Sequence, residues 1–276
     1  MALNTSNYSA MKEIQEIIDN YMKKTAEDEA GKQTNLKFMN KAGVSTIPIS
    51  NKNKKVLSIL ICSLEKRKKQ LNSLLKEINK QIFLCNADAV VELLVEVDNK
   101  EITTGKKRNN LLKKASGKYI CFIDDDDKIY ENYLKLILKS IESDADCIAT
   151  SGTYSVDGGI LINWHLSKDF NDEDKMIYVD KNGNPLEDCI KHINCRGCDW
   201  CSSLRDKSIF EAVYLRRANH LTPVKRELAL KAMFPNISNG EDREYSKKLN
   251  PFLKSEVTIE EKIYHYEYIS YNKEYK

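Results

Sequence analysis

Long apolar runs are missing from this chain of 276 residues, and so is the opening of a secretion signal. No stretch approaches the ~20 consecutive apolar residues that span a bilayer, which excludes an integral membrane segment. The first residues, MALNTSNYSAMKEIQEII, lack a basic start followed by an apolar core, so we expect no exported leader. Hydrophobic residues make up 41% and charged residues 31%, a mixture too apolar for a disordered chain. These features predict a soluble cytoplasmic protein.

An excess of charge of one sign is also missing. The 44 Lys and Arg residues nearly balance the 41 Asp and Glu residues, and the net charge of +3 indicates no class of partner. Basic residues do concentrate in two clusters: Lys52, Lys54, Lys55, Lys66, Arg67, Lys68 and Lys69, then Lys106, Lys107, Arg108, Lys113, Lys114 and Lys118. Each cluster is either a solvated helix face or a contact for a polyanion or a sugar-nucleotide diphosphate.

The N-terminal part differs from the rest. Residues 8–30 carry apolar side chains at helical spacing, which predicts an amphipathic helix, and a polar stretch follows it. We therefore divide the chain into an N-terminal helix with a linker (1–50), a first half (51–150) and a second half (151–276).

Short apolar strands alternate with helices after residue 55. The runs VLSILIC (56–62), VELLVEV (91–97) and YICFI (119–123) predict buried strands, and helical patterns separate them. This alternation is typical of a doubly wound α/β fold, in which ligands bind beyond the carboxyl ends of the strands.

Polar residues follow each of these strands: Ser63 and Glu65 after the first, Asp98 after the second, and Asp124, Asp125, Asp126 and Asp127 after the third. Four adjacent carboxylates repel one another, and Mg²⁺ or Mn²⁺ would compensate them through oxygen ligands. The alternative is an acidic helix start, with Asp127 as the cap of the following helix.

Five segments resemble the inverting family 2 glycosyltransferases of the GT-A fold. They are LSILICSLEKR, ELLVEVDN, GKKRNNLLKKASGKYICFIDDDD, the Asn239-Gly240-Glu241-Asp242 stretch, and IYHYEY at 263–268. The resemblance implies a Rossmann-like, mostly parallel sheet with flanking helices, here with a helical N-terminal extension. Val97 departs from the family, which usually has two adjacent acids where this chain has Val97 and Asp98.

The resemblance also implies a role for each matching residue. The nucleotide sugar would be bound by Ser63, Glu65, Asp98, Arg108, Asn109, Asp124 and Asp125. A metal ion would be held by Asp124, Asp126 and His265. Asp242 would take the proton of the acceptor hydroxyl, and Glu241 would position Asp242 or the acceptor. The structural alternatives are that Asp242 caps a helix and that His265 is a core side chain with its hydrogen bonds made inside the protein.

The implied reaction is a metal-dependent inverting transfer from a nucleotide-diphosphate sugar, with a UDP-sugar expected, to an acceptor hydroxyl. Some compact phage enzymes of similar appearance glycosylate hydroxymethylated DNA bases, and the basic clusters suit such an acceptor. A phage gene would place the enzyme in the host cytoplasm. Protein and glycan hydroxyls are the other acceptors considered.

A second group of residues lies at intervals of three: Cys189, His192, Cys195, Cys198 and Cys201. Such residues suit structural zinc, but one continuous helix would rotate them by ~60° per step, so all five could not face one ion. Packing thiols are the alternative. The remaining cysteines, Cys62, Cys85, Cys121 and Cys147, are expected to be reduced core residues.

Two other functions remain open. A nucleotidyltransferase would also use strand-end aspartates and a metal, but the SLEKRKK segment lacks the glycine-rich loop expected there. A nucleic-acid-binding module built on the cysteine cluster would need no aspartates. Further along, HLTPVKRELALKAMFP (220–235) predicts a helix with Thr222 as its cap and Pro223 in its first position.

Overall fold

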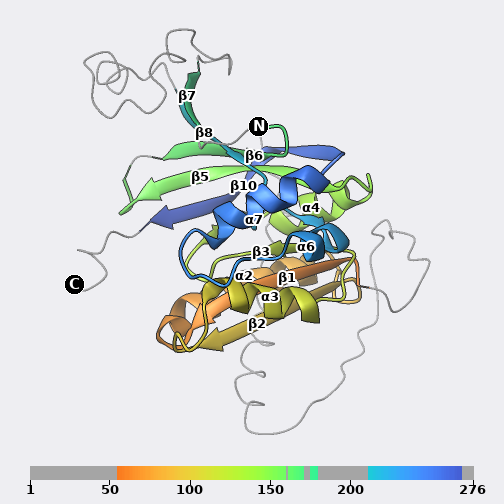
Figure 1. Ribbon diagram of the computed structural model, residues 1–276, viewed down its shortest axis with the longest axis vertical. Coiled ribbons are helices and arrows are strands. Elements are labelled where there is room, and N and C mark those ends of the chain that lie inside the picture. The colour runs from red at the N-terminus through yellow and green to blue at the C-terminus, as the bar shows by residue number, and fades with distance from the viewer. Residues whose placement is uncertain (1–54, 160, 171–174, 180–210, 269–276) are drawn as a thin grey trace, which may run out of the picture. The chain divides into compact units, whose positions relative to one another are not determined.

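The computed structural model describes residues 55–159, 161–170, 175–179 and 211–268 (Figure 1). The predicted N-terminal helix and linker lie outside these residues, as does the cluster from Cys189 to Cys201 with its possible zinc site. Asn51–Lys276 forms one compact unit, which contains every element described below.

The chain up to β3 consists of the strands and helices that the apolar pattern predicts. In chain order they are β1 (Leu57–Leu64), the 3₁₀ turn η1 (Glu65–Arg67), α2 (Lys68–Leu84), β2 (Val91–Asp98), α3 (Thr104–Lys114) and β3 (Tyr119–Phe122). β1 and β3 are almost entirely buried, as expected for central strands of a parallel sheet.

The described chain after β3 contains more strands than helices. Its elements are β4 (Lys128–Ile129), α4 (Tyr133–Ile141), β5 (Cys147–Val156), β6 (Ile162–Ser167), β7 (Lys175–Val179), β8 (Glu211–Arg217), β9 (Val224–Lys225), α6 (Arg226–Ala232), α7 (Glu241–Leu249), η3 (Asn250–Phe252) and β10 (Glu256–Tyr268). None of the helices in the described ranges has both the length and the apolar character needed to cross a bilayer.

One mixed sheet joins the two halves in the order β2-β1-β3-β9-β5-β6-β8-β7 (Figure 1). β2, β1 and β3 are parallel, as in a doubly wound fold, and short β9 links β3 to β5 in antiparallel fashion. β10 runs parallel to β5 along nearly its whole length and also pairs with β4. The division predicted at residue 150 falls inside β5, so both halves share this strand. The α/β class and the flanking helices agree with the prediction.

Hydrophobic clusters cover both faces of the sheet. The first joins α2 and α4 to one face of β1, through residues such as Leu74, Ile137 and Ile59. The second joins α3, α6 and α7 to the other face, where Leu60 lies. Cys62, Cys85, Cys121 and Cys147 are free thiols within or beside these clusters, as predicted, and burial raises the pKa of Cys121 to about 12.

Two predicted helix starts are wrong. Thr222 is buried, and its hydroxyl accepts a hydrogen bond from the backbone of Asn219 rather than capping a helix. Val224 pairs with both β3 and β5, so α6 begins only at Arg226. Asp127 does not cap α4 either, because the residue preceding that helix is Asn132. In both places, pairing across the sheet overrides the local helical signal.

Gly105 fixes how closely α3 approaches the segment before α7. A Cβ at this position would lie 1.9 Å from the carbonyl oxygen of Pro235. Gly105→Ala is therefore expected to cost about 2 kcal/mol of unfolding free energy, since the backbone of Pro235 must move. Urea denaturation measures the loss. Lys106→Ala, an exposed position in the same helix, is the control and should change stability little; equal effects would contradict the close packing.

Candidate functional site

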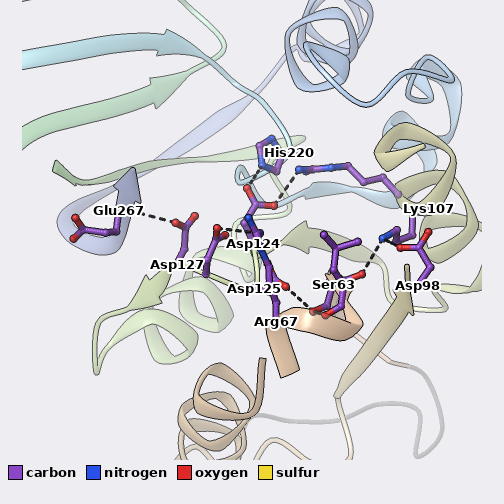
Figure 2. A network of polar contacts seen from close by, with 12 residues as sticks. Ser63, Arg67, Asp98, Lys107, Asp124, Asp125, Asp127, His220 and Glu267 are labelled. Carbon is purple, nitrogen blue, oxygen red and sulfur yellow. Dashed lines mark hydrogen bonds and ion pairs between the residues drawn. The ribbon is translucent and has the colours of Figure 1, made fainter. Parts of the chain in front are cut away.

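The ends of β1 and β3 meet through a buried carboxylate. Asp125 is only 3% exposed, and its side chain accepts hydrogen bonds from Ser63 Oγ (2.5 Å) and Arg67 Nη1 (2.9 Å) (Figure 2). Arg67 lies in η1, directly after β1, and the same Nη1 is 2.9 Å from Asp126 Oδ2. The first and third strand ends therefore lie together, as the sequence predicts, and Arg67 bridges two of the four aspartates.

The end of β2 joins the same network through Lys107. The ammonium group of this buried lysine donates to the carbonyl oxygen of Ser63 (2.8 Å) and forms an ion pair with Asp98. Asp98 also accepts a hydrogen bond from the backbone of Ile102 (3.2 Å). Burial acts to raise the pKa of Asp98, but Lys107 and these hydrogen bonds lower it, so the carboxylate is charged at neutral pH. All three strand ends meet in one site (Figure 2).

Asp124 lies between a guanidinium and an imidazole. Its carboxylate is 3.0 Å from Arg108 Nη2 and 3.2 Å from His220 Nε2. Burial acts to raise its pKa, but the charge of Arg108 and the contact with His220 lower it well below the usual range. Asp124 is therefore a permanently charged group in the middle of the site.

Arg108 connects the aspartates to the start of α7. This buried guanidinium lies 3.5 Å from Glu241 Oε1 and packs beside the rings of Phe122 and Phe234, 5.4 and 5.6 Å from their centroids. Glu241 is 6% exposed, and burial raises its pKa despite Arg108. Glu241 thus pairs with Arg108, and its role in positioning Asp242 or the acceptor stays a prediction.

Asp242, the next residue, is more accessible. Its side chain is 25% exposed and lies 3.5 Å from Arg216 Nη2 at the end of β8. Burial acts to raise its pKa, but His220 and Arg216 lower it below the ordinary value. Asp242 is consequently ionised at neutral pH and able to accept a proton.

Tyr264 of β10 supports the aspartate segment from the other side. Its hydroxyl donates to Asp127 Oδ2 (2.6 Å) and accepts from the backbone N–H of Asp124 (3.2 Å). Asp127 is 5% exposed, and burial together with the charge of Asp124 raises its pKa well above the usual range. Asp127 thus anchors this segment to β10.

Two residues predicted to contact the donor, Asn109 and Glu65, do not join the strand-end network through any contact described above, and their roles stay predictions. Asn109 uses both ends of its amide on the backbone of Phe234, donating to its carbonyl and accepting from its N–H, each at 2.9 Å. It is a structural clamp between α3 and the segment after α6, because α3 turns it away from the strand ends. Glu65 lies in η1 beside the site, but its side chain is exposed.

His265 has hydrogen-bond partners other than Asp124 and Asp126, so its role as a third metal ligand stays a prediction without support from the described contacts. Its Nδ1 is 2.8 Å from Thr153 Oγ1 and its Nε2 is 3.1 Å from Glu267 Oε2. Side chains alternate along a strand, so His265 faces away from Tyr264 and the aspartates. Within the described ranges, no three Asp, Glu, His or Cys side chains form a group that would hold a metal. Of the three predicted ligands, Asp124 and Asp126 have the carboxylate oxygens that Mg²⁺ or Mn²⁺ prefers.

The sequence assigns no individual role to three residues of the site, Arg67, Lys107 and Tyr264, and leaves His220 open between the acceptor cleft and a structural role. Lys107 and Arg67 belong to the basic clusters, which indicate contact with anions but do not identify the aspartates as those anions. His220 and Tyr264 are distant in sequence from the aspartates, and only the sheet brings them close.

The charge of Asp126 costs stability, because burial and the neighbouring Asp124 and Asp125 raise its pKa to about 6 despite Arg67. An acid whose pKa is raised on folding destabilises the protein as pH rises from its unfolded pKa, near 4, to its folded value. Asp126→Asn is expected to be relatively more stable at pH 7.5 than at pH 4.5, by about 1 kcal/mol after allowance for solvent screening. Urea denaturation at both pH values in EDTA measures this difference. If the variant and the wild type differed in unfolding free energy by the same amount at both pH values, the raised pKa of Asp126 would be contradicted.

Comparison with known proteins points to one family. The model of Glycosyl transferase family 2 matches residues 68–214, from α2 to β8. No curated protein matches the chain. Crystal structures of S. aureus TarS 1–349, alone and in complex with UDP, align over 77% of this chain with 14% identity and TM-scores of 0.45 and 0.46. The chain spans 60% of the length of that TarS fragment. Since the family model covers more than half of its residues, the chain belongs to glycosyl transferase family 2.

Proposed function

We propose that this chain transfers a sugar from a nucleotide-diphosphate sugar, with a UDP-sugar expected, to an acceptor hydroxyl, inverting the anomeric carbon. One observation carries the proposal: the ends of β1, β2 and β3 meet in a single network of ionised groups, and Arg108 connects that network to α7, which bears Asp242. In an α/β sheet, this is the edge where ligands bind.

The charges of the network support a diphosphate donor. Arg67, Lys107 and Arg108 each contact an aspartate at a strand end, so cations and carboxylates alternate across the site. Arg67 is 31% exposed and is the most accessible of the three cations, which suits it to contact the diphosphate. Asp98 at the end of β2 would accept hydrogen bonds from the base, and Ser63 would line the same side.

Asp242 would act as the general base. As the acceptor oxygen attacks the anomeric carbon, the bond from that carbon to the diphosphate oxygen breaks, and the hydroxyl proton passes to the Asp242 carboxylate. The electron pair of the broken bond leaves on the nucleoside diphosphate. This single displacement needs no carboxylate nucleophile and inverts the configuration.

A divalent cation would be held by Asp124 and Asp126, whose carboxylate oxygens would serve as its ligands. When bound, it would neutralise the charge that builds on the departing diphosphate. Arg67, which contacts Asp126, would then be released toward the donor.

A hydroxymethylated DNA base stays a predicted acceptor, but the network weakens the reason for it. Lys107 and Arg108 belong to the basic cluster that suggested a polyanion, and both are buried in ion pairs with Asp98, Asp124 and Glu241. They are therefore not available to phosphates along a DNA backbone. Of the two other classes of function, a nucleotidyltransferase is not the family that matches, and the cysteine cluster of a binding module lies outside the described residues.

The test is release of nucleoside diphosphate from a panel of UDP-, GDP- and ADP-sugars, with Mn²⁺, with Mg²⁺ or with EDTA. We expect release from one donor class, and its loss in Asp124→Asn and Asp126→Asn. Lys80→Met, an exposed position on α2, is the matched control and should retain full release. Absence of release from every donor would refute the proposal.

A further inference from the structure

An aromatic surface lies on β5 and β10 next to the aspartates. The rings of Tyr154 and Tyr266 stack, with centroids 5.4 Å apart and an angle of 14° between their planes. Tyr266 is 36% exposed, Tyr268 is 48% exposed and Val156 is 42% exposed. We call these four residues, Tyr154, Val156, Tyr266 and Tyr268, the tyrosine platform.

The strand register places the platform on one face of the sheet. Tyr266 pairs with Tyr154, and Tyr268 pairs with Val156, in the parallel ladder between β10 and β5. Side chains two residues apart share a face, so the platform continues the face of Tyr264, whose hydroxyl binds Asp127. Strands ~4.8 Å apart and a step of ~6.6 Å along each strand give a surface about the size of one sugar ring.

The surroundings of the platform are acidic. Tyr266 lies between Tyr264, whose hydroxyl donates to Asp127 Oδ2 (2.6 Å), and Glu267, whose backbone N–H donates to Asp127 Oδ1 (3.4 Å), so β10 passes the aspartate segment at this residue. The cations of the site act elsewhere, since Arg67 and Arg108 contact Asp125, Asp126 and Asp124 from η1 and α3. The aspartate segment therefore has a cationic side and an aromatic side.

We propose that the tyrosine platform is the acceptor subsite and that it binds a pyranose ring of a neutral glycan. The proposal rests on the proposed function, because it supplies the acceptor for the same reaction. A pyranose ring has an apolar face of C–H groups and an edge of hydroxyls. Its apolar face buries surface against the stacked tyrosines, while the phenol and carboxylate oxygens accept hydrogen bonds from its hydroxyls.

The same chemistry disfavours a nucleic acid on this surface. A base can stack on tyrosine, but the phosphates that flank it would need cations, and Arg67 and Arg108 contact the aspartates from η1 and α3 rather than from the platform. A neutral oligosaccharide carries no such charge. Duplex DNA containing hydroxymethylcytosine is therefore the competitor in the test rather than the expected ligand.

The test measures sugar binding and donor turnover separately on the full chain. Chitotetraose, cellotetraose and maltotetraose are titrated by saturation-transfer NMR against wild type, Tyr266→Ala and Tyr268→Ala. We expect at least one tetrasaccharide to bind wild type, and each variant to weaken it by about tenfold. Phe83→Ala removes a ring that is 56% exposed on α2 and should leave binding unchanged.

Donor turnover without acceptor, followed as release of nucleoside diphosphate, is measured in parallel and should be the same in wild type and Phe83→Ala. The platform is refuted if no tetrasaccharide binds, if the tyrosine variants bind as wild type does, or if the DNA displaces the sugar. In each of those cases donor release would still support the proposed function. If the wild type released no nucleoside diphosphate from any donor, the proposed function itself would be refuted.

Discussion

Asp242→Asn is expected to slow sugar transfer by a factor of 10² to 10⁴ while leaving donor affinity within about twofold. The amide cannot accept the acceptor proton, and general-base catalysis contributes a factor of that size. Asp242 is the accessible acid at the start of α7, and Arg216 and His220 keep it ionised. Initial rates of transfer measure the first effect, and calorimetric titration with the nucleoside diphosphate measures the second.

Glu244→Gln is the matched control for this prediction. Glu244 lies in the same first turn of α7 and forms an exposed ion pair with Lys247. Its loss should change the transfer rate less than twofold. If the two variants were equally active, the base would have to be another residue.

Arg108→Leu is expected to cost 3–5 kcal/mol of unfolding free energy. The substitution leaves Asp124 and Glu241 without the cation that both contact, and an uncompensated charge in a buried site is strongly destabilising. The buried surface between Phe122 and Phe234 would stay filled by leucine, so lost packing accounts for little of the effect. Urea denaturation at pH 7.5 measures the loss.

Two further variants identify its cause. Lys114→Met, in the same helix as Arg108, removes a lysine that is 65% exposed and paired with Glu96 of β2, and it should cost less than 1 kcal/mol. Adding Glu241→Gln to Arg108→Leu should recover part of the stability, since one unpaired carboxylate is gone. No recovery in the double variant would indicate that packing, not charge, dominates.

The parallel part of the fold was predictable because its signal is local. β1, β2 and β3 are short apolar runs with branched residues, and each ends in polar residues that mark the ligand edge of the sheet. The meeting of Ser63, Asp98 and Asp125 in one network follows from that arrangement alone. Here the sequence pattern carried both the element and its orientation.

Features that depend on pairing between distant segments were not predictable in this way. His265 lies one residue from Tyr264, and only the register of β10 decides that the tyrosine, rather than the histidine, faces the aspartates. The helix predicted from Thr222 starts late because Val224 is shared by β3 and β5. Asn109 faces Phe234 because of how α3 packs, which no local pattern records.

Adjacent residues of the second basic cluster have different environments in the folded protein. Lys106 is exposed, as a solvated helix face requires, whereas its neighbours Lys107 and Arg108 are buried in ion pairs with aspartates. One run of basic residues on α3 therefore contains both solvent-exposed and ion-paired side chains. Helical periodicity predicts which side chains are buried, but their carboxylate partners depend on how the strands pair in the sheet.

The most direct test of the central claim is a proton NMR time course of the full chain with an α-linked UDP-sugar, Mn²⁺-free Mg²⁺ buffer and the tetrasaccharide that binds best. The anomeric signals report donor loss and product configuration in one experiment. We predict that the donor doublet disappears and that a β-linked product signal replaces it, because Asp242 supports a single displacement. An α-linked product, or a donor signal that persists unchanged across the nucleotide-sugar panel, would contradict inverting transfer at this site.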